Sequence, residues 1–163
     1  MTKFAILFTG LPGTGKTTVA KKLSQLLPCY YCSTDVIRSF VFNEQLIRED
    51  RDYTVQELDI IYNVALYIAK LQAENNKNLL IEGVYRNKIM RDRMVKALSD
   101  YGYTVFKYHI TCDDRVAIQR VEDRKNRETL SPAGKKGYSE IKAKFEYPDE
   151  QEGFSMIDNS IDS

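Results

Sequence analysis

Long apolar runs are absent from this 163-residue chain, and no stretch approaches the roughly 18 apolar residues that a membrane-spanning helix requires. An excess of one charge is absent too, because 24 Lys and Arg side chains face 23 Asp and Glu, for a net charge of +1. That balance excludes a general basic field for nucleic acid. Internal repeats and low-complexity segments are also missing. We therefore expect a soluble, cytoplasmic protein with a single domain over residues 1–163.

Cysteine is scarce, and three cysteines are too few for a disulfide framework. Cys29 and Cys32 in CYYC, followed by His109 and Cys112 in HITC, resemble a zinc pattern. Both segments have the character of strands, in which residues three apart point to opposite faces of the sheet. One metal ion would then be unable to reach both Cys29 and Cys32, so we predict buried free thiols instead.

Periodicity divides the chain into alternating strands and helices. Short apolar runs predict strands at residues 3–8, 30–32, 78–83, 103–110 and 154–160. Helical patterns occur at about 16–27, from 36, at 55–73, at 87–98, from 113 and in a short segment after 140. In the longest helix, an apolar stripe contains Leu58, Ile61, Ala65 and Ala69. The alternation predicts an α/β fold whose parallel sheet is covered by helices on both faces.

A glycine-rich loop follows the first predicted strand and leads into the first helix. Residues 10–17, GLPGTGKT, match the pattern G-x-x-x-x-G-K-[ST] in full. Glycines let backbone N–H groups converge on phosphate oxygens, and the helix N-terminus adds partial positive charge. Lys16 is expected to reach the β- and γ-phosphates, and Thr17 to bind Mg²⁺ through its hydroxyl. The loop predicts a nucleoside triphosphate site; the alternative is a chance glycine turn beside a surface lysine.

Three classes of nucleotide-binding protein then compete, namely a GTPase switch, a motor ATPase and a kinase. Guanine-specific switches read the base with N-K-x-D, and neither NNKN nor RNKIM supplies the aspartate. Motor ATPases generally have longer chains. A kinase needs a base near the acceptor hydroxyl and cations around the transferred phosphoryl group.

The segment STDVIRSF offers the base. Asp35 follows the second predicted strand, and Arg38 lies three residues later on the same helical face. We expect Asp35 to accept the proton of the acceptor hydroxyl and Arg38 to bind an anionic group of the acceptor or the transferring phosphoryl. The alternatives are that Asp35 caps the helix and that the two residues form a solvated ion pair.

The segment QRVEDRKNRE offers the cations. Arg120, Arg124 and Arg127 share a helical face that leads into a basic loop with Lys135 and Lys136. Such a face can close over the polyphosphate and exclude water, and we expect a lid over about residues 124–140. The alternative is a solvated helix face, because acidic residues alternate with the arginines.

Glu82, at the end of the segment LLIEG, is a third acidic candidate. We expect it either to orient water on Mg²⁺ or to hold an arginine that binds the acceptor. Arg86, Arg91 and Arg93 follow closely enough to supply that arginine. A glutamate exposed at the sheet edge, with no role, is the alternative.

Taken in order, the glycine loop through Thr18, STDVIR, LLIEG and RVAIQRVEDR resemble the small P-loop kinases, which have an AAA-type ATP-binding core. This group includes the 5′-hydroxyl polynucleotide kinase domain, gluconate kinases, chloramphenicol phosphotransferase and zeta-toxin-like kinases. The D-x-x-R of Asp35 and Arg38 is most similar to the polynucleotide kinase domain, in which these positions supply the base and a ligand of the reacting phosphate. The resemblance implies five parallel strands in the order 2-3-1-4-5. An aspartate is usual where this chain has Glu82.

The resemblance also implies a set of site residues. For ATP these are Gly10, Gly13, Thr14, Gly15, Lys16, Thr17, Thr18, Arg120 and Arg124, with Mg²⁺ on Thr17; for the acceptor they are Asp35, Arg38, Glu82 and Arg86. The acceptor site is expected beside the polar segment 48–53. A 5′-hydroxyl polynucleotide end is the first choice of acceptor, followed by a sugar, a nucleoside or an antibiotic alcohol. An ATP-binding sensor without catalysis is the remaining alternative.

Overall fold

The structure, a computed structural model, describes residues 2–42, 50–125 and 133–160. Its strands are β1 (Phe4–Thr9), β2 (Cys29–Ser33), β3 (Asn78–Glu82), β4 (Thr104–Thr111) and β5 (Ser155–Asp158). Its helices are α1 (Lys16–Leu26), α2 (Thr34–Val41), α4 (Val55–Glu74), α5 (Lys88–Asp100), α6 (Asp114–Lys125) and α7 (Lys135–Ala143), and a 3-10 turn, η1 (Glu150–Glu152), precedes β5. In these ranges, no helix is both long and apolar enough to cross a membrane.

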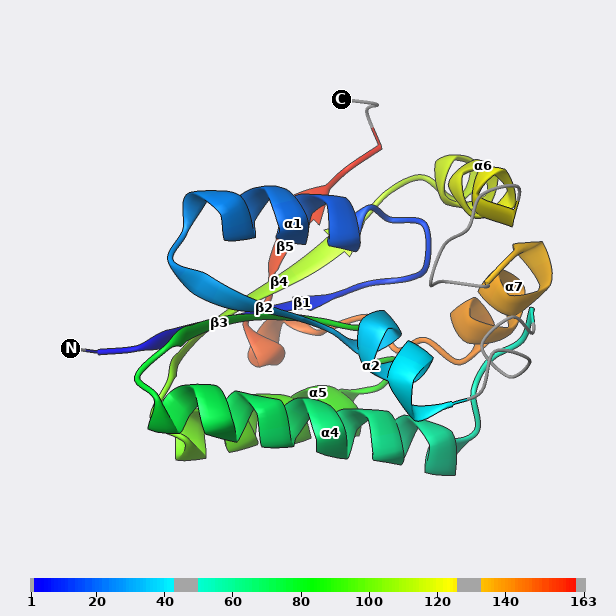
Figure 1. The fold of residues 1–163 in the computed structure, drawn as a ribbon. Helices are drawn as coiled ribbons and strands as arrows, with labels where there is room; N and C mark the ends of the chain where they lie inside the picture. Colours follow the sequence, from blue (N-terminus) through cyan, green and yellow to red (C-terminus); the bar gives the residue numbers. More distant parts are fainter. Residues whose placement is uncertain (1, 43–49, 126–132, 161–163) are drawn as a thin grey trace.

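The strands form one parallel sheet in the order β2-β3-β1-β4-β5, which confirms the predicted fold. Helix α1 covers one face of the sheet, and α4 and α5 cover the other (Figure 1). The register places Phe8 of β1 beside Glu82 of β3 and Tyr108 of β4. Since the strands are parallel, their carboxyl ends meet at one edge, and α2, α6 and α7 lie at that edge (Figure 1). Open α/β sheets bind their ligands there.

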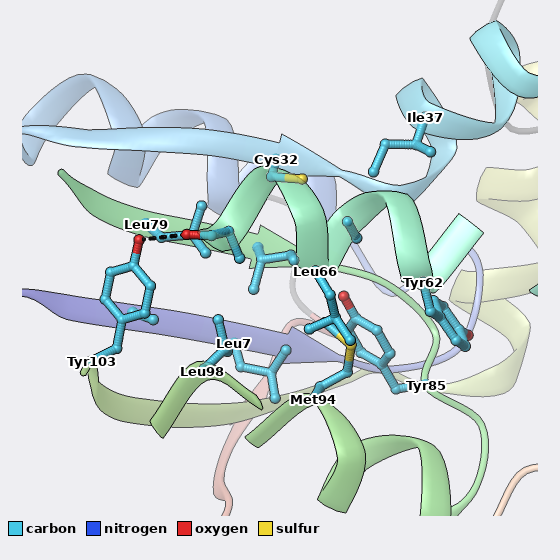
Figure 2. Packing of buried hydrophobic residues seen from close by; sticks show 14 of the residues in the cluster. Leu7, Cys32, Ile37, Tyr62, Leu66, Leu79, Tyr85, Met94, Leu98 and Tyr103 are labelled. Carbon is cyan, nitrogen blue, oxygen red and sulfur yellow. Dashed lines mark hydrogen bonds between the residues drawn. The ribbon is translucent and has the colours of Figure 1, made fainter. Parts of the chain in front are cut away.

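The largest apolar cluster lies between the sheet and helices α4 and α5 (Figure 2). Ile61, Ala65 and Ala69 of the predicted stripe are at most 3% exposed, so the periodicity correctly identified the buried face of α4. Tyr103 lies at one end of the cluster in Figure 2, and its hydroxyl donates to the Ala69 carbonyl oxygen at 3.1 Å, the dashed line. This hydrogen bond links α4 to the residue that precedes β4.

Strand β1 is buried on both faces, which explains its uninterrupted apolar run. Leu7 belongs to the cluster beneath α4, and Phe8 belongs to a second cluster beneath α1. Alternation on β2 likewise places Cys32 in the first cluster and Cys29 against the second, as predicted. The cysteines are free thiols, and the part of the chain that the structure describes has no group of three or more metal-ligating side chains.

Helix α7 begins at Lys135, earlier than the short helix predicted after residue 140 and inside the predicted basic loop with Lys135 and Lys136. A distant residue stabilises its first turn. The Asp50 carboxylate accepts hydrogen bonds from the Gly134 and Gly137 N–H groups, each at 2.7 Å. Asp50 precedes Gly134 by 84 residues, so no local pattern could reveal this cap.

Candidate functional site

A cleft opens at the carboxyl edge of the sheet and encloses about 860 Å³, part of it open to solvent. It brings together predicted residues from four separate segments of the chain. The predicted site residues in its walls are Gly13, Gly15, Lys16, Thr17, Asp35, Arg38, Glu82, Arg86 and Arg124. Gly10, Thr14, Thr18 and Arg120 lie outside this lining, and Thr18 is exposed on α1.

The glycine loop has the backbone that a phosphate cradle requires. Gly13 and Gly15 have φ angles of 79° and 91°, in the left-handed region that side chains disfavour. A Cβ on Gly13 would overlap the Ala117 carbonyl oxygen of α6, so the loop also packs closely against that helix. Gly15 is the N-cap of α1, and the first N–H groups of the helix therefore face the loop. Backbone N–H groups and the helix terminus together suit an anion.

Lys16 lies in the cradle and is only 8% exposed. Its ammonium group donates to the Leu11 carbonyl oxygen at 2.8 Å, across the loop. Burial lowers the pKa of Lys16, while the negative charges of Glu82 and Asp35 raise it in opposition. A buried cation at the glycine loop, with a loop carbonyl as its hydrogen-bond partner, is well placed to bind a phosphate oxygen.

Glu82 forms the centre of a hydrogen-bonded group on the other side of the loop. It is 3% exposed, so the expectation of a glutamate exposed at the sheet edge is wrong, while its role in the site stays a prediction. The Thr17 hydroxyl donates to Glu82 at 2.9 Å, and the Tyr31 hydroxyl donates to it at 2.6 Å. Burial, followed by the Glu82 charge, raises the pKa of the Tyr31 phenol. Hydroxyl and carboxylate oxygens are ligands that Mg²⁺ prefers, directly or through water.

Tyr31 is a site residue that the sequence did not indicate. In the sequence, Tyr31 is an aromatic residue of a short predicted strand, where aromatic residues are common. Its contact with the site depends on the pairing of β2 with β3, which aligns Ser33 with Glu82. A signal of this kind is visible only once the strand order is known.

Asp35 and Arg38 lie in the first turns of α2, as predicted. Ser33 occupies the N-cap position and Asp35 lies inside the helix, so the interpretation of Asp35 as the helix cap is wrong. Asp35 Oδ1 and Arg38 Nη1 are 2.7 Å apart, and the side chains are 34% and 10% exposed. The Arg38 guanidinium lies 4.9 Å from the centre of the Tyr53 ring. The Tyr53 ring therefore packs against the arginine of the pair, and the Asp35 side chain lines the cleft.

The arginines after β3 do not pair with Glu82 as one hypothesis suggested. Arg86 is 8% exposed and forms an ion pair with Asp52, in the segment expected to contact the acceptor. Arg91 forms a buried ion pair with Glu152 at 2.6 Å. Arg93 pairs with a surface carboxylate of α4. Arg86 is therefore the one of the three that lines the cleft, together with Asp52.

The arginine face of α6 divides between two environments. Arg124 lines the cleft, and its charge contributes to lowering the pKa of Lys16. Arg120 instead donates to the Asn159 carbonyl oxygen at 3.1 Å. Arg127 lies outside the described residues, as does Arg48 of the expected acceptor segment.

Comparison with known proteins assigns the chain to a family. A family model described as an AAA domain matches residues 6–143. The chain belongs to this AAA domain family. A UPF0200 protein of Pyrobaculum aerophilum is 28% identical over 115 residues, which are 71% of this chain and 63% of that protein. The chain of this AAA domain protein thus spans under two thirds of that relative's length.

Solved structures share the fold of this AAA domain protein. A sugar kinase from Janibacter sp. HTCC2649 superposes with a TM-score of 0.75 at 18% identity, covering 96% of this chain and 85% of that one. A chain of the Pnkp1/Rnl/Hen1 RNA repair complex has a TM-score of 0.68 at 16% identity, covering 86% and 42%. At these identities the likeness establishes the fold, which is that of the P-loop kinases.

Proposed function

We propose that this protein is a kinase that transfers the γ-phosphoryl group of ATP to a hydroxyl group. One observation carries the proposal: the phosphate cradle of Lys16 and the Asp35–Arg38 pair open into the same cleft. A triphosphate in the cradle and a hydroxyl beside Asp35 would therefore meet in one enclosed space. The single domain over residues 1–163 contains both halves of this site.

On the donor side, the chain supplies cations and oxygen ligands. The cradle and Lys16 bind the phosphates, and Arg124 approaches them from α6. Thr17 and Glu82 would hold Mg²⁺, which would supply positive charge to neutralise the phosphates. Tyr31 restrains the Glu82 carboxylate through its 2.6 Å hydrogen bond.

On the acceptor side, Asp35 takes the proton as the acceptor oxygen attacks phosphorus. Arg38 keeps the carboxylate in place and positions an anionic group of the acceptor. Asp52 and Arg86, held as an ion pair, line the far wall with Tyr53. The alternative is that Asp35 and Arg38 form only a local ion pair. It accounts for the same contact, but it provides no base for the acceptor hydroxyl.

For the acceptor we propose a 5′-hydroxyl polynucleotide end, supported by the D-x-x-R pattern at Asp35 and Arg38. Arg38, Arg51 and Arg86 surround the acceptor half of the cleft and suit the phosphate that follows such an end. A small alcohol such as a sugar is the second candidate, because a sugar kinase shares the fold.

The test is a transfer assay with radiolabelled ATP. It is run across 5′-hydroxyl oligonucleotides, sugars, nucleosides and antibiotic alcohols. Label that moves to one acceptor class, and fails to move in Lys16→Ala, supports the kinase and identifies the substrate. Slow hydrolysis that no acceptor stimulates would contradict the kinase and indicate an ATP-binding sensor.

A further inference from the structure

Asn159, the first residue after β5, contacts three segments of the chain that are distant from it or from one another in sequence. Its backbone N–H donates to the Thr111 carbonyl oxygen at 2.8 Å, which extends the pairing of β5 with β4. Its side-chain amide donates to the Thr14 carbonyl oxygen at 2.9 Å. Its own carbonyl oxygen accepts from Arg120 Nη1 at 3.1 Å. One residue thus connects the sheet, the phosphate loop and α6.

The contact with Thr14 determines the orientation of a group in the cradle. The Thr14 carbonyl and the Gly15 N–H belong to one planar trans peptide unit, in which they point in opposite directions. A carbonyl held by Asn159 therefore turns the Gly15 N–H away from Asn159, to the other side of the loop. Gly15 is also one of the residues that line the cleft.

The fit between Asn159 and the loop is close enough to restrict both residues. A Cβ on Gly15 would overlap the Asn159 side-chain nitrogen. The glycine is thus required by the amide behind it as well as by its φ of 91°. The amide must also be a donor, because its partner is a carbonyl oxygen. An aspartate of the same shape would place a carboxylate oxygen against that carbonyl.

We propose that Asn159 is a positioning residue for nucleotide binding. It orients the Thr14–Gly15 peptide through its side chain and fixes Arg120, one turn before Arg124, through its backbone carbonyl. The cradle and the arginine face of α6 are thereby held in one arrangement before the nucleotide arrives. This inference rests on the proposed function only in that the bound anion is a nucleoside triphosphate.

The test compares Asn159→Asp with Asn75→Asp. Asn75 is a matched control, because its side-chain amide also donates to a backbone carbonyl, that of Leu71, at 2.8 Å, far from the cleft. Calorimetry measures the affinity for ATP with Mg²⁺ and for inorganic tripolyphosphate, and thermal melting measures stability. We expect Asn159→Asp to weaken the binding of both ligands by about tenfold or more. The reason is that the hydrogen bond from the Gly15 N–H to a charged phosphate oxygen would be misaligned. Asn75→Asp should leave both affinities unchanged at a similar melting temperature.

A second measurement works on the protein without nucleotide. In ¹H–¹⁵N spectra the Gly15 amide resonance should move in Asn159→Asp and stay in place in Asn75→Asp. If the wild type binds ATP and Asn159→Asp binds it within twofold, or the Gly15 resonance does not move, the positioning role is wrong. If the wild type fails to bind ATP while the Gly15 resonance moves as expected, the proposed function fails and the positioning of the loop stands.

Discussion

Replacing Asp35 with Asn separates a catalytic base from a structural ion pair. The amide has nearly the shape of the carboxylate, and its oxygen can still accept from Arg38 Nη1, 2.7 Å away in the native pair. With exposures of 34% and 10%, the partly solvated pair contributes about 1 kcal/mol to the free energy of unfolding. For a chain of this length that loss lowers Tm by about 2–4 °C. The fold and the ATP affinity should therefore survive.

Phosphoryl transfer should fall far more than stability does. A positioned general base contributes about 10²–10⁴-fold to the rate. At about 1.36 kcal/mol for each factor of ten, that loss is about 2.7–5.4 kcal/mol in the activation free energy. Arg38→Ala should weaken acceptor binding or the chemical step, with ATP affinity preserved.

The assay is single-turnover transfer from radiolabelled ATP to the acceptor found in the screen, with calorimetry for ATP and melting for stability. Asp59→Asn is the matched control, because Asp59 and Arg93 form a similar pair at 2.9 Å on the surface, away from the cleft. Normal transfer in Asp35→Asn, with Asp35→Ala merely melting earlier, would refute the role of Asp35 as base. The base would then be sought at Glu82.

Four further predictions follow from single contacts. Lys16→Ala should weaken binding of ATP with Mg²⁺ or abolish turnover, since a buried cation of the cradle is lost; unchanged affinity and activity would contradict the phosphate site. Arg124→Ala should lower kcat by about a hundredfold or more with a smaller change in the KM for ATP, and a wild-type kcat would leave this arginine as surface. Tyr31→Phe removes a restraint on the site carboxylate, so we expect a higher Mg²⁺ concentration for half-maximal activity and weaker Mn²⁺ binding by electron paramagnetic resonance; identical titrations would argue against that role. Glu57 has its pKa lowered from 4.5 to about 2, first by hydrogen bonding to Arg51. Its contribution to stability is therefore complete above about pH 4.5 and is lost as the pH falls toward 2. Glu57→Gln should flatten the acid side of the stability curve in that range, and an unaltered curve from urea melts would show that the pair contributes nothing.

The sequence by itself determined the features that depend on neighbouring residues or on a repeating period. The loop at residues 10–17 is recognisable because its glycines, Lys16 and Thr17 act together over one short segment. The stripe that includes Ile61 and Ala65 is recognisable because a buried helix face repeats every 3.6 residues. The alternation of such segments determined the fold class, and the resemblance to the P-loop kinases supplied the strand order.

Tertiary structure alone decided which side chains meet. Glu82 accepts from Thr17 and Tyr31, which lie 65 and 51 residues away in the chain, so no local pattern contains the group. Asn159 reaches Thr14 across 145 residues only because β5 is placed at the edge of the sheet beside β4. Such contacts depend on strand order and register, which are determined by packing of the whole chain, whereas the sequence records only the separate partners.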